Sequence, residues 1–111
     1  MDGRYREFLE NPQPPVKLRN ALEGYFSDPE PAHHQAYGDY LRRRLRPAME
    51  KLIAEDAADR IEILLAQDWV DATQMEQFLL TARQMKKPAA MACLLQEKAN
   101  RFGFRDRDFS L

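Results

Sequence analysis

Apolar residues recur every three or four positions along most of the chain, and this spacing predicts α-helices rather than strands. The first helix is expected over Gly3–Glu10, and a second from about Pro15 to Phe26, where apolar positions fall on one helical face. The first helix would bury Tyr5, Phe8 and Leu9, and the second Leu18, Ala21, Leu22, Tyr25 and Phe26.

Prolines divide the next stretch. A third helix is predicted from about Pro31 toward Arg46, with Tyr37, Tyr40 or Leu41, and Leu45 as its apolar positions. Proline disfavours helical angles in the residue before it, so Pro47 predicts a kink or break at Arg46. A further helix is then expected over Ala48–Glu55.

Polar residues mark where the last three helices begin. Asp56 is a favourable N-cap, because its carboxylate can accept backbone donors of the first turn, and it predicts a helix that ends near Gln67. Asp71 and Gln74 form a variant of the capping box, which predicts a helix as far as Met85.

The last helix is predicted from Pro88 to about Arg101, because proline is tolerated at a first helical position and Gly103 favours a helix end. The tail over residues 104–111 contains Phe104 and Phe109, which we expect to fold back onto the last helices.

The second half of the chain contains a pattern that occurs twice. Leu52 and Leu80 are 28 residues apart, as are Ala54 and Ala82, and the pairs Leu64-Leu65 and Leu94-Leu95 follow at a spacing of 30. A period of this size is typical of stacked helical hairpins. It predicts that the four leucines Leu64, Leu65, Leu94 and Leu95 are buried at matching places.

An alanine in one helix, followed by a run such as Ile61-Glu62-Ile63-Leu64-Leu65 in the next, resembles an ankyrin-type repeat over roughly residues 49–101. Met91-Ala92-Cys93-Leu94-Leu95 is similar to the same run. The resemblance implies an all-α stack of antiparallel hairpins used for protein binding. The Thr-Pro-Leu-His signature is missing from both copies, so a generic helical-hairpin repeat fits the same residues.

The length of 111 residues is typical of one domain. We expect N-terminal helices over 1–46 that cap two hairpin repeats over 47–103, followed by the tail. A net charge of −1 argues against a dedicated nucleic-acid binder. The single cysteine, the absence of a secretory signal and the absence of an apolar run of membrane-spanning length favour a cytoplasmic protein that binds no membrane.

No residue pattern indicates catalysis. His33 and His34 are adjacent, so on a helix they point about 100° apart and lack the spacing of metal ligands; we expect them to be exposed. Cys93 lies in an apolar stripe and is expected to be a core residue. Catalytic and phosphate-binding motifs are missing. We therefore expect no enzyme activity, no metal and no cofactor.

Arg42, Arg43, Arg44 and Arg46 form the densest basic cluster. On one continuous helix, Arg42, Arg43 and Arg46 would share a side, where pairs with Asp39 and Glu50 at i, i+4 would make a solvated, salt-bridged face. Arginine also binds carboxylates and phosphates through paired hydrogen bonds, so a contact with an acidic partner stays open.

Trp69, the single tryptophan, lies between the two repeats. Such a ring can close the end of the core, but tryptophan and arginine are also the residues most enriched in binding hot spots. The sequence predicts a non-catalytic protein–protein interaction module, an adaptor or a small inhibitor, that uses Arg42, Arg43, Arg46 and Trp69. The alternative is a nucleic-acid-associated protein that binds phosphates through the Arg42–Arg46 segment.

Overall fold

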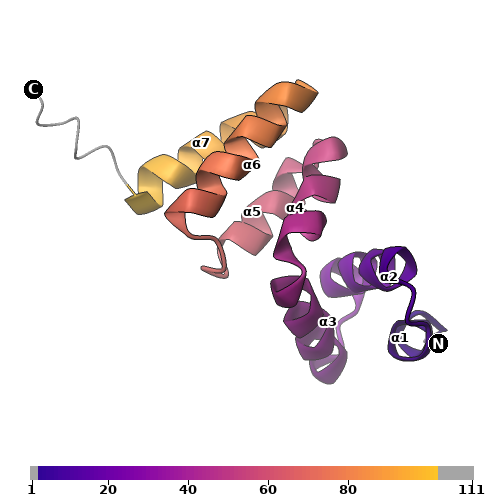
Figure 1. Ribbon diagram of the computed structural model, residues 1–111. Coiled ribbons are helices and arrows are strands. Elements are labelled where there is room, and N and C mark those ends of the chain that lie inside the picture. Colours follow the sequence, from indigo (N-terminus) through magenta and orange to yellow (C-terminus); the bar gives the residue numbers. More distant parts are fainter. Residues whose placement is uncertain (1–2, 103–111) are drawn as a thin grey trace, which may run out of the picture. The chain divides into compact units, whose positions relative to one another are not determined.

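The computed structural model describes residues 3–102, and this part of the chain is all-helical, with seven helices and no strand (Figure 1). The predicted all-α class is therefore confirmed. Contacts divide the chain into two compact units, one up to Ala48 and one from Met49. The helices are α1 Gly3–Glu10, α2 Pro14–Ser27, α3 Pro31–Arg43, α4 Leu45–Ala54, α5 Ala58–Leu65, α6 Ala72–Met85 and α7 Pro88–Phe102.

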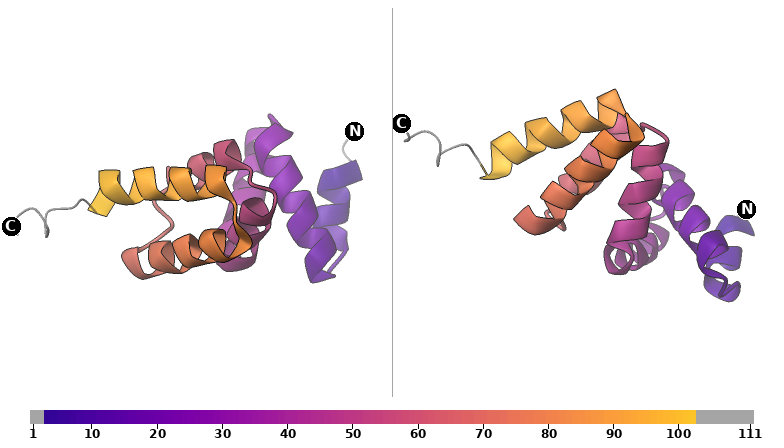
Figure 2. Two further views of the ribbon diagram at one scale, coloured as in Figure 1. Left: turned by 90° about the horizontal axis from the view of Figure 1, so that it is seen from above. Right: turned by 45° about the horizontal axis from the view of Figure 1, so that its top comes forward.

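In the first unit, α2 packs against both α1 and α3 (Figure 2). The apolar face predicted for α2 is largely confirmed, because Ala21, Leu22 and Tyr25 are buried. The prediction for α1 is partly wrong, since Phe8 is buried but Leu9 is 56% exposed. Aromatic rings supply much of this core, namely those of Phe8, Tyr25, Tyr37 and Tyr40.

Gly24 allows α2 and α3 to approach closely. A Cβ atom added at Gly24 would lie only 2.2 Å from Cε2 of the Tyr37 ring, far inside van der Waals contact. The Tyr37 side chain is fully buried, and its hydroxyl has no hydrogen-bond partner among the described residues. The ring of Tyr37 therefore occupies the space that a side chain at position 24 would need.

The break before α4 lies at Arg44, so the prediction of a break at Arg46 is wrong. Arg44 leaves the helical region with φ −118° and ψ 41°, and α4 begins at Leu45. Pro47 is then the third residue of α4. Proline is accommodated in a first helical turn, because the backbone N–H it lacks has no intrahelical acceptor there.

In the second unit, α7 packs against both α5 and α6 (Figures 1 and 2). The predicted capping box is confirmed: the Asp71 carboxylate accepts the backbone N–H of Gln74 at 2.7 Å, and the Gln74 side chain accepts the N–H of Asp71 at 3.0 Å. Pro88 begins α7, as predicted. Phe104 and Phe109, with the rest of the predicted tail, lie outside the described residues.

The turns that follow α4 and α6 have the same geometry, 30 residues apart. Asp56 and Lys86 adopt left-handed angles, with φ 53° and 57°. The next residue donates its N–H five positions back in each case, from Ala57 to Leu52 and from Lys87 to Ala82. This is the hydrogen-bond pattern of a Schellman helix end, formed here without glycine.

The prediction that Asp56 is the N-cap of α5 is wrong. The residue before α5 is Ala57, which makes no side-chain cap. The carboxylate of Asp56 instead accepts the backbone N–H of Ala90, at 2.8 Å, in the first turn of α7. Asp56 thus has a left-handed backbone angle, and its carboxylate caps the start of α7, 34 positions later in the sequence.

The predicted match in burial holds for part of the repeat. Leu64, Leu65 and Leu94 are buried, but Leu95 is 47% exposed, so the prediction for Leu95 is wrong. Helix α7 buries Ala90 and Leu94, one turn apart, and Leu95 lies about 100° around the helix from Leu94. The earlier pair also differs, because Leu52 is buried and Leu80 is exposed. The ankyrin-like resemblance and the single-domain organisation stay predictions.

Candidate interaction site

The four arginines of the basic cluster span the junction between α3 and α4. Arg42 and Arg43 belong to the last turn of α3, Arg44 is the non-helical residue, and Arg46 is in the first turn of α4. All four side chains are exposed. The prediction that Arg42, Arg43 and Arg46 share one side of a continuous helix is therefore wrong.

The fold leaves two of these charges without a counter-ion. Within residues 3–102, Arg42 and Arg43 make no ion pair, and the predicted pair between Arg43 and Asp39 is not formed. The C-terminus of α3, where the helix dipole is negative, favours positive charge at this place but leaves both guanidinium groups open to solvent. Both can therefore bind an external anion.

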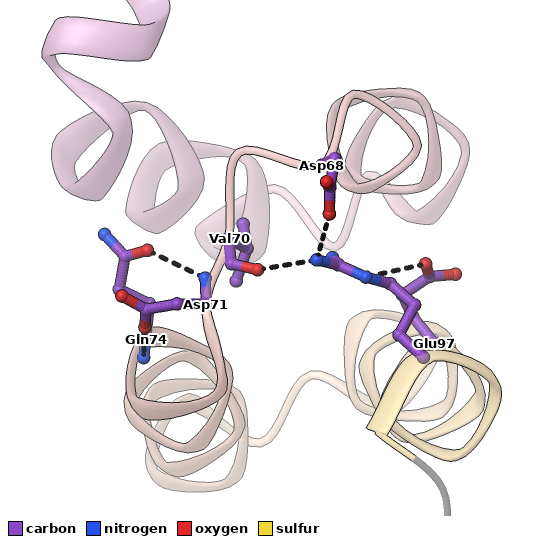
Figure 3. Close-up of polar contacts among 6 residues, drawn as sticks. Asp68, Val70, Asp71, Gln74 and Glu97 are labelled. Carbon is purple, nitrogen blue, oxygen red and sulfur yellow. Dashed lines mark hydrogen bonds and ion pairs between the residues drawn. The ribbon is translucent and has the colours of Figure 1, made fainter.

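Trp69 lies in the loop between α5 and α6 and is half-buried. Asp68 and Val70, on either side of this residue, both accept hydrogen bonds from Arg101 in α7 (Figure 3). Its Nη2 atom donates to the Asp68 carboxylate at 2.5 Å and to the Val70 carbonyl oxygen at 2.8 Å. Its Nε atom lies 3.8 Å from the Glu97 carboxylate, which orients the guanidinium group from within α7.

The same loop is closed by local structure at each end. Asp68 adopts a left-handed angle, with φ 66°, just after α5, and the Asp71–Gln74 capping box begins α6 (Figure 3). The backbone around Trp69 is therefore constrained before any partner binds. The role of Arg101 was missed, because no local pattern indicates an interaction with a residue 33 positions earlier.

The rings of the two histidines stack on tyrosine rings, which no local pattern in the sequence predicts. His33 stacks on Tyr5 with 3.7 Å between ring centroids, and its Nδ1 atom is 2.9 Å from the Asp28 carboxylate. His34 stacks on Tyr25 at 4.2 Å. The N–H of Glu30 and the His33 ring, in that order, lower the pKa of Asp28. The expected exposure is found only for His34, since His33 is largely covered.

Cys93 is half-buried and its chemistry is suppressed. Its thiol donates to the Ala58 carbonyl oxygen at 3.6 Å. Burial, and to a lesser degree the nearby carboxylates of Glu62, Glu97 and Asp59, together raise the pKa of the thiol to about 11. The thiolate, which is the reactive form, is thus strongly disfavoured at neutral pH.

The structure places the arginines and Trp69 in different units, and each surface stands by itself. No protein-family model matches the chain, and neither does any curated protein or solved structure. Among residues 3–102, no helix has both the length and the apolar character needed to cross a bilayer.

Proposed function

We propose that the chain is a non-catalytic protein–protein interaction module. The observation that carries the proposal is the pair of exposed arginines, Arg42 and Arg43, that have no counter-ion within residues 3–102. A cation that stabilises no contact within the fold is available for recognition, and arginine is suited to carboxylates. An adaptor or a small inhibitor would use such a surface in the same way.

The loop around Trp69 supports the proposal as a second contact surface. Arg101 and the Asp71–Gln74 capping box constrain its backbone, so little conformational entropy would be lost when a partner binds there. A half-buried tryptophan in a constrained loop is a typical interface anchor.

We also propose that α4–α5 and α6–α7 are two helical-hairpin repeats, similar to ankyrin-type repeats. The support is the Schellman turn that recurs 30 residues apart, at Asp56 and at Lys86. The equivalent burial of Leu64 and Leu94 is consistent with this repeat. Stacked hairpins of this kind usually serve as binding scaffolds.

The alternative partner is a nucleic acid, which the unpaired arginines would also attract. The aromatic ring nearest to them in sequence is Tyr40, which is only 6% exposed and offers no free face on which a base could stack. A protein partner is therefore the better match to this surface.

The test is quantitative mass spectrometry of proteins crosslinked to the tagged parent chain in its source cells. One variant carries Glu at Arg42, Arg43 and Arg46, and another carries Trp69→Ala; both are first checked for helical content. We expect at least one crosslinked protein to be lost from one of the two variants. If both variants retain every partner of the parent, these surfaces are not the site. Material that is removed by nuclease and by salt would favour the nucleic-acid alternative.

A further inference from the structure

An apolar groove lies within the first unit, between the start of α2 and the junction of α3 with α4. It has a volume of about 390 Å³. Three of its lining residues are prolines, whose fixed φ angle makes the wall rigid before any ligand binds. The lining residues are Pro14, Pro15, Leu18, Tyr40, Arg44 and Pro47.

Cations surround the single aromatic ring of this groove. The Arg44 guanidinium carbon is 5.9 Å from the centroid of the Tyr40 ring, and Lys17 Nζ is 5.6 Å from the same centroid. Lys17 is further held over the Phe8 ring, at 4.3 Å, and donates to the Phe8 carbonyl oxygen. The groove thus combines an apolar lining with positive charge at fixed positions.

The two residues that precede Arg44 are also positively charged. Arg42 and Arg43 directly precede the lining residue Arg44 and have no ion pair within residues 3–102. Across residues 3–48 the sequence has eight basic and six acidic side chains, a net charge of +2, whereas residues 49–102 have a net charge of −2. Four of the eight basic residues of this unit lie within residues 42–46, and one of them, Arg44, lines the groove.

We propose that this groove binds an acidic, amphipathic segment of another protein; the inference rests on the proposed interaction function and names the chemistry of the partner. Apolar side chains of the segment occupy the space between Leu18 and the three prolines of the lining. Its carboxylates pair with Arg42, Arg43 and Arg44. A nucleic acid would satisfy the arginines but leave the apolar lining uncovered, so it matches only half of the site.

The probe is a library of random dodecapeptides displayed on phage and selected on the full-length parent protein. Two groove variants are made: Leu18→Glu changes a lining residue, and Arg43→Glu changes the arginine that precedes the lining residue Arg44. They are compared with Leu9→Glu and Arg6→Glu, which make the same changes at exposed positions of α1 outside the groove lining. We expect selected peptides to combine Asp or Glu with Leu, Ile, Phe or Trp. Their affinity should fall at least tenfold for both groove variants and stay within about twofold for both controls.

Four results would overturn the inference. These are selection of no peptide, selection of basic or uncharged peptides, equal binding to groove and control variants, and binding of a single-stranded oligonucleotide that Arg43→Glu abolishes but Leu18→Glu does not affect. If a glutamate variant fails to fold, Leu18→Asn and Arg43→Gln replace it, and the tenfold criterion becomes threefold.

The experiments distinguish a failure of the groove proposal from a failure of the proposed function. A cellular partner that is lost with Trp69→Ala but retained by Leu18→Glu would leave the interaction function standing and remove the groove from it. A parent chain with no specific cellular partner would contradict the proposed function, whatever peptides the groove selects.

Discussion

At the scale of single residues, the burial of a side chain decides its contribution to stability more than the residue type does. Leu65 is 1% exposed and Leu95 is 47% exposed, although both end a Leu-Leu pair at the same place in the sequence pattern. Leu94, the neighbour of Leu95, supplies the buried contact of α7 instead. The two leucines therefore form a matched pair for mutagenesis.

Leu65→Ala should lower the free energy of unfolding by about 2–5 kcal/mol, because the removed atoms leave a cavity in a packed core. Leu95→Ala should change it by no more than about 0.5 kcal/mol, as is usual for surface positions. Urea denaturation of the parent protein and the two variants measures both changes in the free energy of unfolding. Equal losses in the two variants would contradict the assignment of Leu95 to the surface.

Cys93 should react slowly with a thiol reagent in the native protein. Its pKa of about 11 means that the thiolate fraction at pH 8 is roughly a hundredfold below that of an ordinary thiol. The labelling rate should rise with pH through this pKa, and in urea it should match that of a small thiol. Native labelling within a few-fold of the small-thiol rate at pH 8 would show that the thiol is not protected.

At the scale of elements, the helices are joined by contacts that no pattern within a single helix predicts. Asp56 ends α4 in a left-handed turn and also caps α7, so one residue sets the geometry of two helices. Lys86 forms the equivalent turn after α6, and its side chain caps no helix within residues 3–102, so a substitution there isolates the effect of the turn.

Glycine at either position should relieve the same left-handed strain, because glycine adopts positive φ readily. Asp56→Gly also removes the acceptor for the Ala90 N–H, which costs about 0.5–2 kcal/mol. We therefore expect Asp56→Gly to be less stable than Lys86→Gly by about that amount, as measured by chemical denaturation. Identical changes in the two variants would mean that the Asp56–Ala90 hydrogen bond contributes nothing.

The contact between α2 and α3 depends on Gly24. A Gly→Ala change inside a helix normally stabilises it by about 0.5–1 kcal/mol. Here the new methyl group would overlap the Tyr37 ring, so Gly24→Ala should destabilise the protein by about 1–3 kcal/mol, measured by thermal or urea unfolding. Gly3→Ala, with open space around the added carbon, is the control. A stabilised Gly24→Ala variant would contradict the close approach of the two helices.

At the scale of the whole molecule, the described chain is helical throughout and its charge is unevenly distributed. Helices cover 82% of the described residues. The far-UV circular dichroism spectrum of the protein should therefore be that of a predominantly helical chain. A spectrum dominated by strand would contradict the fold.

The groove lined by Arg44 lies in the first unit, and the Trp69 loop lies in the second. Residues 3–48 carry a net positive charge and residues 49–102 carry a net negative charge. An acidic partner would therefore be attracted to the first unit rather than to the second. An acidic segment is expected to bind the first unit, and the Trp69 loop remains a proposed contact for a partner of other chemistry.

The sequence by itself determined the helical class, most helix bounds and the capping box at Asp71 and Gln74. These features depend on hydrogen bonds and side chains within about one helical turn, so a local pattern is enough to predict them. The arginine cluster and Trp69 were also evident as candidates, because residue type alone marks them.

Only the tertiary structure decided which residue caps α7, which leucine of the last pair is buried and where the helix breaks before α4. It also decided that Arg101 fixes the Trp69 loop and that Leu18, Tyr40 and Arg44 line one groove. The partners of Asp56 and Arg101 lie more than 30 residues away in sequence. Such pairs depend on how the helices pack, and no period or spacing along the chain encodes that packing directly.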